Sequence, residues 1–188
     1  MKVLLDTCVL YPTVMREVLL GVARAGLFEP LWSSRILEEW ALAARKLGPT
    51  GEVMARGDIA LLRTAWPKAE VPRAAAIEAR LWLPDENDIH VLAAANTGSA
   101  DILVTLNAKD FPQNTMAEEG LTRRDPDGFL WELWSGAPDQ VGDVVRAVQA
   151  EAERLSGEAK PLRALMKKAQ LPKLGKAVEQ LKRDQSNC

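Results

Sequence analysis

The sequence contains few of the residues that build disulfide frameworks or zinc sites. Its 188 residues include two cysteines, Cys8 and Cys188, near opposite ends, and one histidine, His90. Two distant thiols resemble neither kind of site, and they favour a reducing, cytoplasmic location. A Ser–His–Asp or Cys–His nucleophilic site would have to use His90. Its place inside a predicted helix suits packing or a hydrogen bond to a metal-binding residue better.

Long apolar runs are also absent. No run approaches the roughly 18 residues that would cross a bilayer, and the first residues lack the basic segment and cleavage site of a secretory signal. We therefore expect a soluble cytoplasmic protein that is not exported and has no membrane partner. The six tryptophans mostly fall at helical spacing among aliphatic residues, which favours core packing, although one or two could stack on nucleic-acid bases.

The net charge of −2 conceals an uneven distribution of charge along the chain. From residue 151 onward nine Lys/Arg face five Asp/Glu, whereas residues 1–150 hold 15 Lys/Arg against 21 Asp/Glu. An acidic body with a basic tail is one way to hold cations beside a polyanion. The solvated face of amphipathic surface helices would give the same pattern in the tail.

Short apolar runs alternate with segments of helical periodicity. The predicted strands are residues 2–6, 28–32 and 102–106, with a short edge strand at 121–123, and helices lie between them. This alternation predicts an α/β fold with a parallel sheet and helical crossovers. Residues 50–83 are expected to form a helical insertion, with helices at 53–66 and 73–82. Further helices are predicted at 129–134, 141–156, 161–170 and 174–183.

Carboxylates stand at the edges of these core elements. Asp6 ends the first strand, Asp88 opens a helix at 89–95, and Asp110 follows the strand at 102–106. Ligands gather outside the carboxyl ends of parallel strands, so these acids are expected to form one cluster. Such clusters bind Mg²⁺ or Mn²⁺, and metals about 3.5–4 Å apart can activate water against a phosphodiester. A helix starting at Ser34 offers a fourth acid, either Glu38 or Glu39, with Glu39 slightly closer to the apolar face.

Most of these acids also have structural explanations. Asp85 and Asp88 could cap the start of a helix, and Glu38 or Glu39 could favour the positive end of theirs. Asn107 and Asp110 could be ordinary turn residues. Asp6 fits such explanations least, because a carboxylate directly after a buried strand needs a partner.

Four segments, LLDTCVL, SSRILEEW, LPDENDIHVLAAA and LVTLNAKDFP, occur in order within residues 2–112. Together they resemble the PIN-domain ribonucleases, the fold of VapC-type toxins, which is a short parallel sheet in a three-layer α/β/α arrangement. The resemblance implies that the catalytic, metal-binding acids are Asp6, Glu39, Asp88 and Asp110. It places Thr7, Asp85, Thr105 and Asn107 around them as supporting residues. Asn107 stands where many relatives have Asp, which puts a second metal in doubt.

The resemblance further implies Mg²⁺- or Mn²⁺-dependent cleavage of single-stranded RNA by a toxin that pairs as a homodimer and is silenced by an antitoxin protein. It assigns residues 1–125 to the nuclease domain and 126–188 to a helical C-terminal extension, whose basic face could bind RNA, a partner or the protein itself. Asn107 and the basic tail also suggest an alternative, a catalytically silent PIN-like RNA-binding module. A haloacid-dehalogenase phosphatase would need a second Asp where Cys8 stands, so we set it aside.

Overall fold

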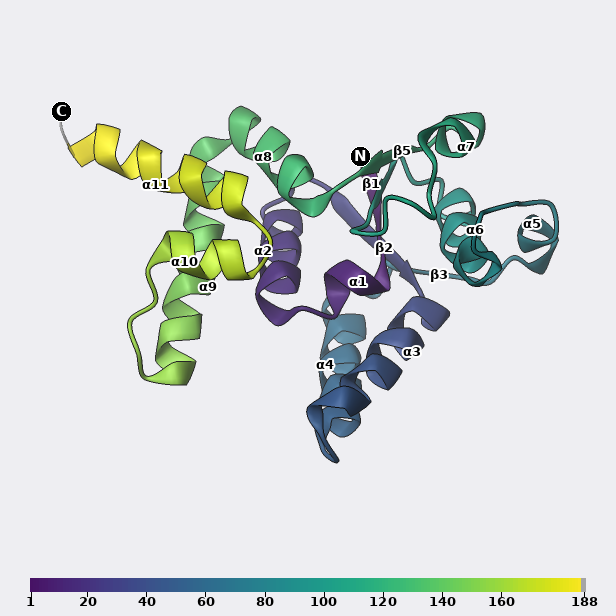
Figure 1. Ribbon diagram of the computed structural model, residues 1–188, viewed down its shortest axis with the longest axis horizontal. Helices are drawn as coiled ribbons and strands as arrows, with labels where there is room; N and C mark the ends of the chain where they lie inside the picture. Colours follow the sequence, from purple (N-terminus) through teal and green to yellow (C-terminus); the bar gives the residue numbers. More distant parts are fainter. Residues whose placement is uncertain (187–188) are drawn as a thin grey trace. The chain divides into compact units, whose positions relative to one another are not determined.

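The computed structural model of the chain describes residues 1–186, which form two compact units (Figure 1). The first, which we call the sheet unit, comprises residues 1–11 and 28–124. The second, which we call the helical unit, comprises residues 12–27 together with the chain from residue 125 onward. The assignment of functional domains to 1–125 and 126–188 stays a prediction. The unit with the C-terminal helices also includes residues 12–27, which that assignment places in the nuclease domain.

The sheet unit is built on five parallel strands in the order β3-β2-β1-β4-β5. The central strand β1 is fully buried at Val3, Leu4 and Leu5, as expected for a strand covered on both faces. The predicted parallel sheet is confirmed, and so is the edge strand. The strand β3 was not predicted, because two residues are too few to show a period. The strands are β1 Lys2–Leu5, β2 Glu29–Ser33, β3 Glu70–Val71, β4 Ile102–Val104 and β5 Thr122–Arg124.

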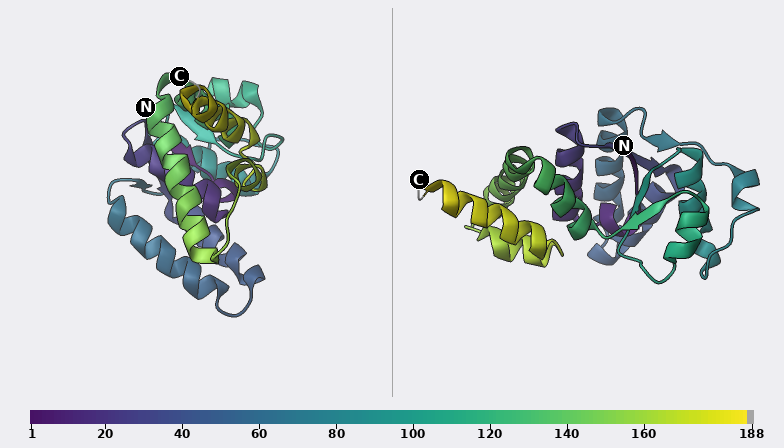
Figure 2. Two further views of the ribbon diagram at one scale, coloured as in Figure 1. Left: turned by 90° about the vertical axis from the view of Figure 1, so that its left-hand side faces the viewer. Right: turned by 90° about the horizontal axis from the view of Figure 1, so that it is seen from above.

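Helices cover this sheet in the predicted α/β/α arrangement (Figures 1 and 2). Helix α6 packs on β1 and β2, and α4 packs on α3. The helix predicted at 73–82 is wrong beyond its first turns: Leu81 and Leu83 are buried while Trp82 between them is 67% exposed, an alternation typical of extended chain. The helices of this unit are α1 Thr7–Leu10, α3 Ser34–Ala43, η1 Ala44–Leu47, α4 Gly51–Ala65, α5 Ala75–Glu78, η2 Glu86–Asp88, α6 Ile89–Thr97 and α7 Gln113–Glu118.

Two strand ends turn directly into helices at the carboxyl edge of the sheet. The first strand ends at Leu5, one residue earlier than predicted, and Asp6 caps α1 by accepting a hydrogen bond from the backbone N–H of Thr7 at 2.6 Å. At the end of β2, Ser33 caps α3 by accepting from the N–H of Ile36 at 3.2 Å. Side chains in the first turns of α1 and α3 therefore start from the same edge.

The helical unit consists of α2 Thr13–Arg24, α8 Pro126–Gly136, α9 Pro138–Ser156, α10 Leu162–Lys168 and α11 Pro172–Ser186. The predicted C-terminal helices are confirmed. Helix α2 packs on α9, where Gly21 lies so close to Val144 that a methyl group at Gly21 would come within 2.5 Å of it. Cys188 lies outside the described residues. Within residues 1–186, no helix combines the length and the apolar character needed to span a membrane.

The tryptophans divide between core and surface. Trp32 of β2 and Trp40 of α3 are buried, at 0% and 3% exposure, in agreement with the expected core packing. Trp66, Trp131 and Trp134 are half-buried. Trp82 is exposed, so core packing does not account for it.

Gly98, at the end of α6, gives a test of how tightly this helix is seated on the sheet. An added methyl group would lie 2.7 Å from Leu31 and 2.9 Å from Val71, on β2 and β3. We expect Gly98→Ala to lower the free energy of unfolding by about 1–3 kcal/mol, because overpacking must displace one of these strands. Urea unfolding followed by circular dichroism measures the change.

Gly57→Ala is the matched control, since Gly57 lies in α4 with no heavy atom near the added methyl group. It should raise stability by about 0.5–1 kcal/mol through helix propensity alone. Equal effects of the two substitutions would show that α6 is not closely packed against the strands.

Candidate metal centre

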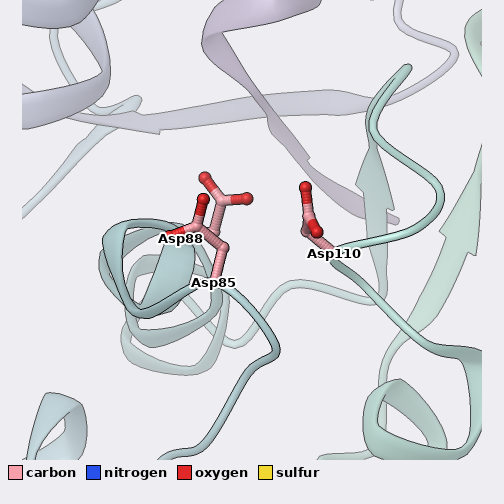
Figure 3. A group of neighbouring side chains, drawn as sticks. All are labelled: Asp85, Asp88 and Asp110. Carbon is pink, nitrogen blue, oxygen red and sulfur yellow. The ribbon is translucent and has the colours of Figure 1, made fainter.

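Three carboxylates converge beside the carboxyl edge of the sheet. One oxygen each from Asp85, Asp88 and Asp110 lies within 4.8 Å of the other two, and all three residues are half-buried. Figure 3 shows Asp85 and Asp88 at the start of the helix α6 and Asp110 facing them from the loop after β4. We call this group the acid cluster. Segments far apart in the sequence therefore supply one compact set of oxygen ligands.

Helix capping accounts for one member of the acid cluster and not for another. Asp85 caps η2, because its Oδ1 accepts a hydrogen bond from the backbone N–H of Asn87 at 2.9 Å. Asp88 is the N-cap residue of α6 but makes no side-chain capping bond. Its Oδ2 instead accepts a hydrogen bond from Nδ2 of Asn107 at 2.9 Å. The structural explanation by capping thus holds for Asp85 and fails for Asp88.

The pKa of Asp88 shows how strongly negative charge is concentrated here. Burial, followed by the charges of Asp6, Asp85 and Asp110, raises this pKa from 3.8 to about 6, and His90 acts weakly in the opposite direction. The neighbouring carboxylates raise the free energy of the ionised form. A bound cation would remove that repulsion, so the electrostatics favour cation binding.

Asp6 is held next to the cluster by hydrogen bonds from its own surroundings. It is 8% exposed, and its Oδ2 accepts from Oγ1 of Thr105 at 2.7 Å and from Sγ of Cys8 at 3.1 Å. Among residues 1–186, the cluster defined by mutual oxygen distances does not include Asp6. Its charge nevertheless contributes to the raised pKa of Asp88. Asp6 therefore adds to the negative field of the cluster.

Cys8 is a neighbour of Asp6, and no sequence motif pointed to a functional role for it. Burial, together with the charge of Asp6, raises the pKa of the thiol to about 12, so it remains protonated and serves as a donor. The backbone N–H of Leu106 donates to its sulfur at 3.2 Å. The thiol thereby joins Asp6 to the loop that also carries Asn107.

Glu39, and not Glu38, faces Thr7 and His90. Oγ1 of Thr7 donates to Oε2 of Glu39 at 3.1 Å, and Nε2 of His90 lies 2.9 Å from its Oε1. Burial alone would raise the pKa of Glu39, but the contacts with His90 and Thr7 outweigh burial and lower it. Glu38 pairs with Arg56 at 2.7 Å instead. The small difference in helical position noted in the sequence thus corresponds to a clear difference in surroundings.

One further cation connects the elements around the site. Nε of Arg35 donates to Oε1 of Glu39 at 3.2 Å, and its Nη2 donates to the backbone carbonyl of Asn87 at 3.4 Å. Arg35 therefore links α3 to η2, the segment between Asp85 and Asp88. Its position in the first turn of α3 gave no sign of this role.

The donor set is suited to a hard divalent cation. Asp85, Asp88 and Asp110 offer carboxylate oxygens, which are the ligands that Mg²⁺ and Mn²⁺ prefer. Thr105 donates a hydrogen bond to Asp6, and Thr7 donates one to Glu39. Asp85 lies in the cluster itself, whereas the sequence placed it in support. The roles of the site residues remain predictions.

Comparison with known proteins identifies the sheet-forming part of the chain. A family model described as PIN domain matches residues 2–109, a span that includes Asp6, Glu39 and Asp88 and ends one residue before Asp110. Neither a curated protein nor a solved structure matches the chain.

The raised pKa of Asp88 predicts a pH-dependent change in stability. The folded protein disfavours the ionised carboxylate of Asp88, so ionisation of this group lowers the free energy of unfolding. This loss of stability is fully present above pH 6 and disappears as the pH falls toward 3.8. In EDTA, Asp88→Asn should therefore raise the melting temperature at pH 7.5, with a gain that shrinks through pH 6 and vanishes near pH 4. Thermal unfolding followed by circular dichroism measures it.

Glu86→Gln provides the control, since Glu86 is exposed in the same segment and lies outside the acid cluster. It should change the melting temperature much less. A pH-independent gain in Asp88→Asn would contradict the electrostatic explanation.

Proposed function

This chain belongs to the PIN domain family, and on that basis we propose that it is a metal-dependent endoribonuclease that cleaves single-stranded RNA. The observation that carries the proposal is the acid cluster, in which Asp88 has neighbouring carboxylates and no capping bond of its own. Structural roles account poorly for such an arrangement, because repulsion between like charges opposes folding.

The proposed site combines the acid cluster with Asp6 and Glu39. Bound there, Mg²⁺ or Mn²⁺ would activate a water molecule and neutralise charge on the phosphodiester. Asp88 and Asp110 would hold the ion, and Asp85 would add a ligand while keeping its capping bond. Asp6, oriented by Thr105 and Cys8, would extend the site toward the centre of the sheet. Glu39, with its lowered pKa, is ready to act as a carboxylate at neutral pH.

A catalytically silent PIN-like RNA-binding module is the second candidate, and Asn107 is the observation that favours it. Its amide donates to Asp88 at 2.9 Å, at a position where a fourth carboxylate could otherwise have served a second cation. An amide in that place reduces the negative charge available for binding. In this second candidate the site binds RNA but lacks the negative charge needed to hold a catalytic ion.

Metal titration and an RNA cleavage assay together test the nuclease proposal. We expect the wild type to bind Mn²⁺ in isothermal titration and to cut a mixed RNA pool. Asp88→Asn should lower the affinity for Mn²⁺ at least about tenfold and slow cleavage at least about 100-fold, because the substitution removes a ligand oxygen. Glu86→Gln should change neither result substantially. The fitted stoichiometry shows whether one or two ions bind beside Asn107.

The two candidates give different results in this assay. If a folded wild type binds RNA but cuts none in Mg²⁺ or Mn²⁺, and Asp6→Asn leaves binding unchanged, the silent module is correct. Cleavage that persists undiminished in both Asp6→Asn and Asp88→Asn would place the chemistry elsewhere.

We also propose the biological role that the sequence motifs suggest, a cytoplasmic toxin that pairs as a homodimer and is silenced by an antitoxin protein. The support is the resemblance of the four segments to VapC-type toxins. Induced expression in a bacterial host should arrest growth for the wild type and not for Asp6→Asn at equal protein level. Equal growth of both strains would reject the toxin role and leave the nuclease proposal to the cleavage assay.

A further inference from the structure

The last helices of the helical unit carry an excess of positive charge. Residues 159–181 contain six Lys/Arg and a single acid, Glu179. Four of the lysines lie on α10 and α11 or at their junction, and all four are exposed: Lys167, Lys168, Lys173 and Lys176. We call them the lysine surface.

These lysines differ from three arginines of the same unit, which lie next to carboxylates. On α9, Arg146 pairs with Asp143 and Arg154 pairs with Glu151, at 2.8 and 2.7 Å. On α10, Arg163 lies 3.8 Å from Glu179, the only acid of the segment. Within the described part of the chain, none of the four lysines forms an ion pair. Among the side chains that the structure describes, no carboxylate therefore neutralises their charge.

Helix stability does not account for the lysine surface. Lys167 and Lys168 lie in the last turn of α10, where the helix dipole favours a cation. Lys173 lies in the first turn of α11 and Lys176 just beyond it, nearer the end where the dipole opposes a cation. The helix dipole thus explains Lys167 and Lys168 but not Lys173 and Lys176.

The scaffold holds the lysine surface in a defined arrangement. Helices α10 and α11 pack closely at Gly175, where an added methyl group would lie 2.6 Å from Met166. Asp127 on α8 accepts hydrogen bonds from the backbone N–H groups of Lys173 and Leu174, which fixes the start of α11. The ammonium group of Lys173 lies 3.6 Å from the centre of the Trp131 ring. The backbone that carries the four lysines is therefore fixed by packing and hydrogen bonds, and the ammonium group of Lys173 is held against Trp131.

The composition of this surface indicates the chemistry of its partner. Between residues 159 and 181 no large apolar side chain is exposed, and Leu165, Leu171 and Leu174 are buried. A membrane-surface helix or an apolar protein interface would expose such residues. Unpaired lysine ammonium groups are suited to phosphates along a polyanion, with which they interact as point charges.

We propose that the lysine surface binds the sugar–phosphate backbone of single-stranded RNA at a site that does not include the acid cluster. The choice of RNA among polyanions rests on the proposed function. The surface provides sequence-independent affinity, so that long substrates bind more tightly than fragments that occupy the acid cluster alone.

Fluorescence anisotropy with the full chain tests the proposal. The probe is a fluorescein-labelled, unstructured RNA of about 20 nucleotides in EDTA, which prevents cleavage, at salt concentrations from about 50 to 200 mM. The variant Lys167→Gln/Lys168→Gln/Lys176→Gln should lose about tenfold or more in affinity. Its slope of log affinity against log salt should fall by about 2, because each phosphate contact on a single strand contributes about 0.7.

The control variant Lys46→Gln/Lys68→Gln/Arg154→Gln removes the same charge from exposed positions outside the lysine surface. It should keep the wild-type salt slope. Equal losses in both variants, or no loss in the lysine-surface variant, would overturn the proposal. Binding of the wild type to phosphatidylserine vesicles but not to RNA would also overturn it.

The two proposals fail in different ways. Lysine-dependent RNA binding without any cleavage in Mn²⁺ would reject the nuclease function and leave the lysine surface as an RNA-binding site. If the wild type cleaves RNA but the triple lysine variant binds RNA as tightly as the wild type, the proposed lysine surface is rejected and the nuclease function stands.

Discussion

Repulsion among carboxylates at one edge of the sheet is the constraint on which this site depends. Burial, followed by the charges of Asp6, Asp85 and Asp110, raises the pKa of Asp88 to about 6, well above its usual value. The fold tolerates this because the carboxylates are supplied by separate elements whose backbone is fixed by strand pairing and by capping. Asp6 and Asp85 both make capping hydrogen bonds, so the same side chains stabilise the chain locally and concentrate negative charge. The residues that stabilise the chain locally are thus also residues of the proposed cation site.

The supporting residues act on the carboxylates in different ways. Neutral donors orient Asp6 and Asp88 without cancelling their charge: a hydroxyl and a thiol contact the first, and an amide contacts the second. Glu39 is different, because His90 and Arg35 place cationic or ionisable groups against it. The pKa is accordingly raised at Asp88 and lowered at Glu39. This difference favours a cation beside Asp88 and Asp110, with Glu39 at the periphery.

The sequence predicted the parallel sheet because apolar runs and helical periods alternate clearly. It could not predict β3, which is two residues long and owes its conformation to pairing with Trp32 and Ser33 of β2. Asp6 was singled out because it follows a buried strand, whereas Thr105 was named only through the resemblance to the PIN domain. The contribution of Cys8 and the inclusion of Asp85 in the acid cluster depend on tertiary contacts. Capping propensity explains Asp85 fully at the level of local sequence, and only the position of Asp110 reveals that Asp85 also belongs to the acid cluster.

The discontinuity of the helical unit has a consequence for how the chain is made. Helix α2 belongs to this unit, and its buried residues include Met15, Val18 and Leu19, yet its packing partner α9 begins only at Pro138. During synthesis the apolar face of α2 therefore leaves the ribosome long before α9 exists. Contacts between residues so far apart in the sequence form late and slowly. Until they form, the apolar face of α2 stays exposed and the chain is prone to aggregation. For the same reason, cutting the chain at the domain boundary predicted from the sequence would leave α2 without its natural cover.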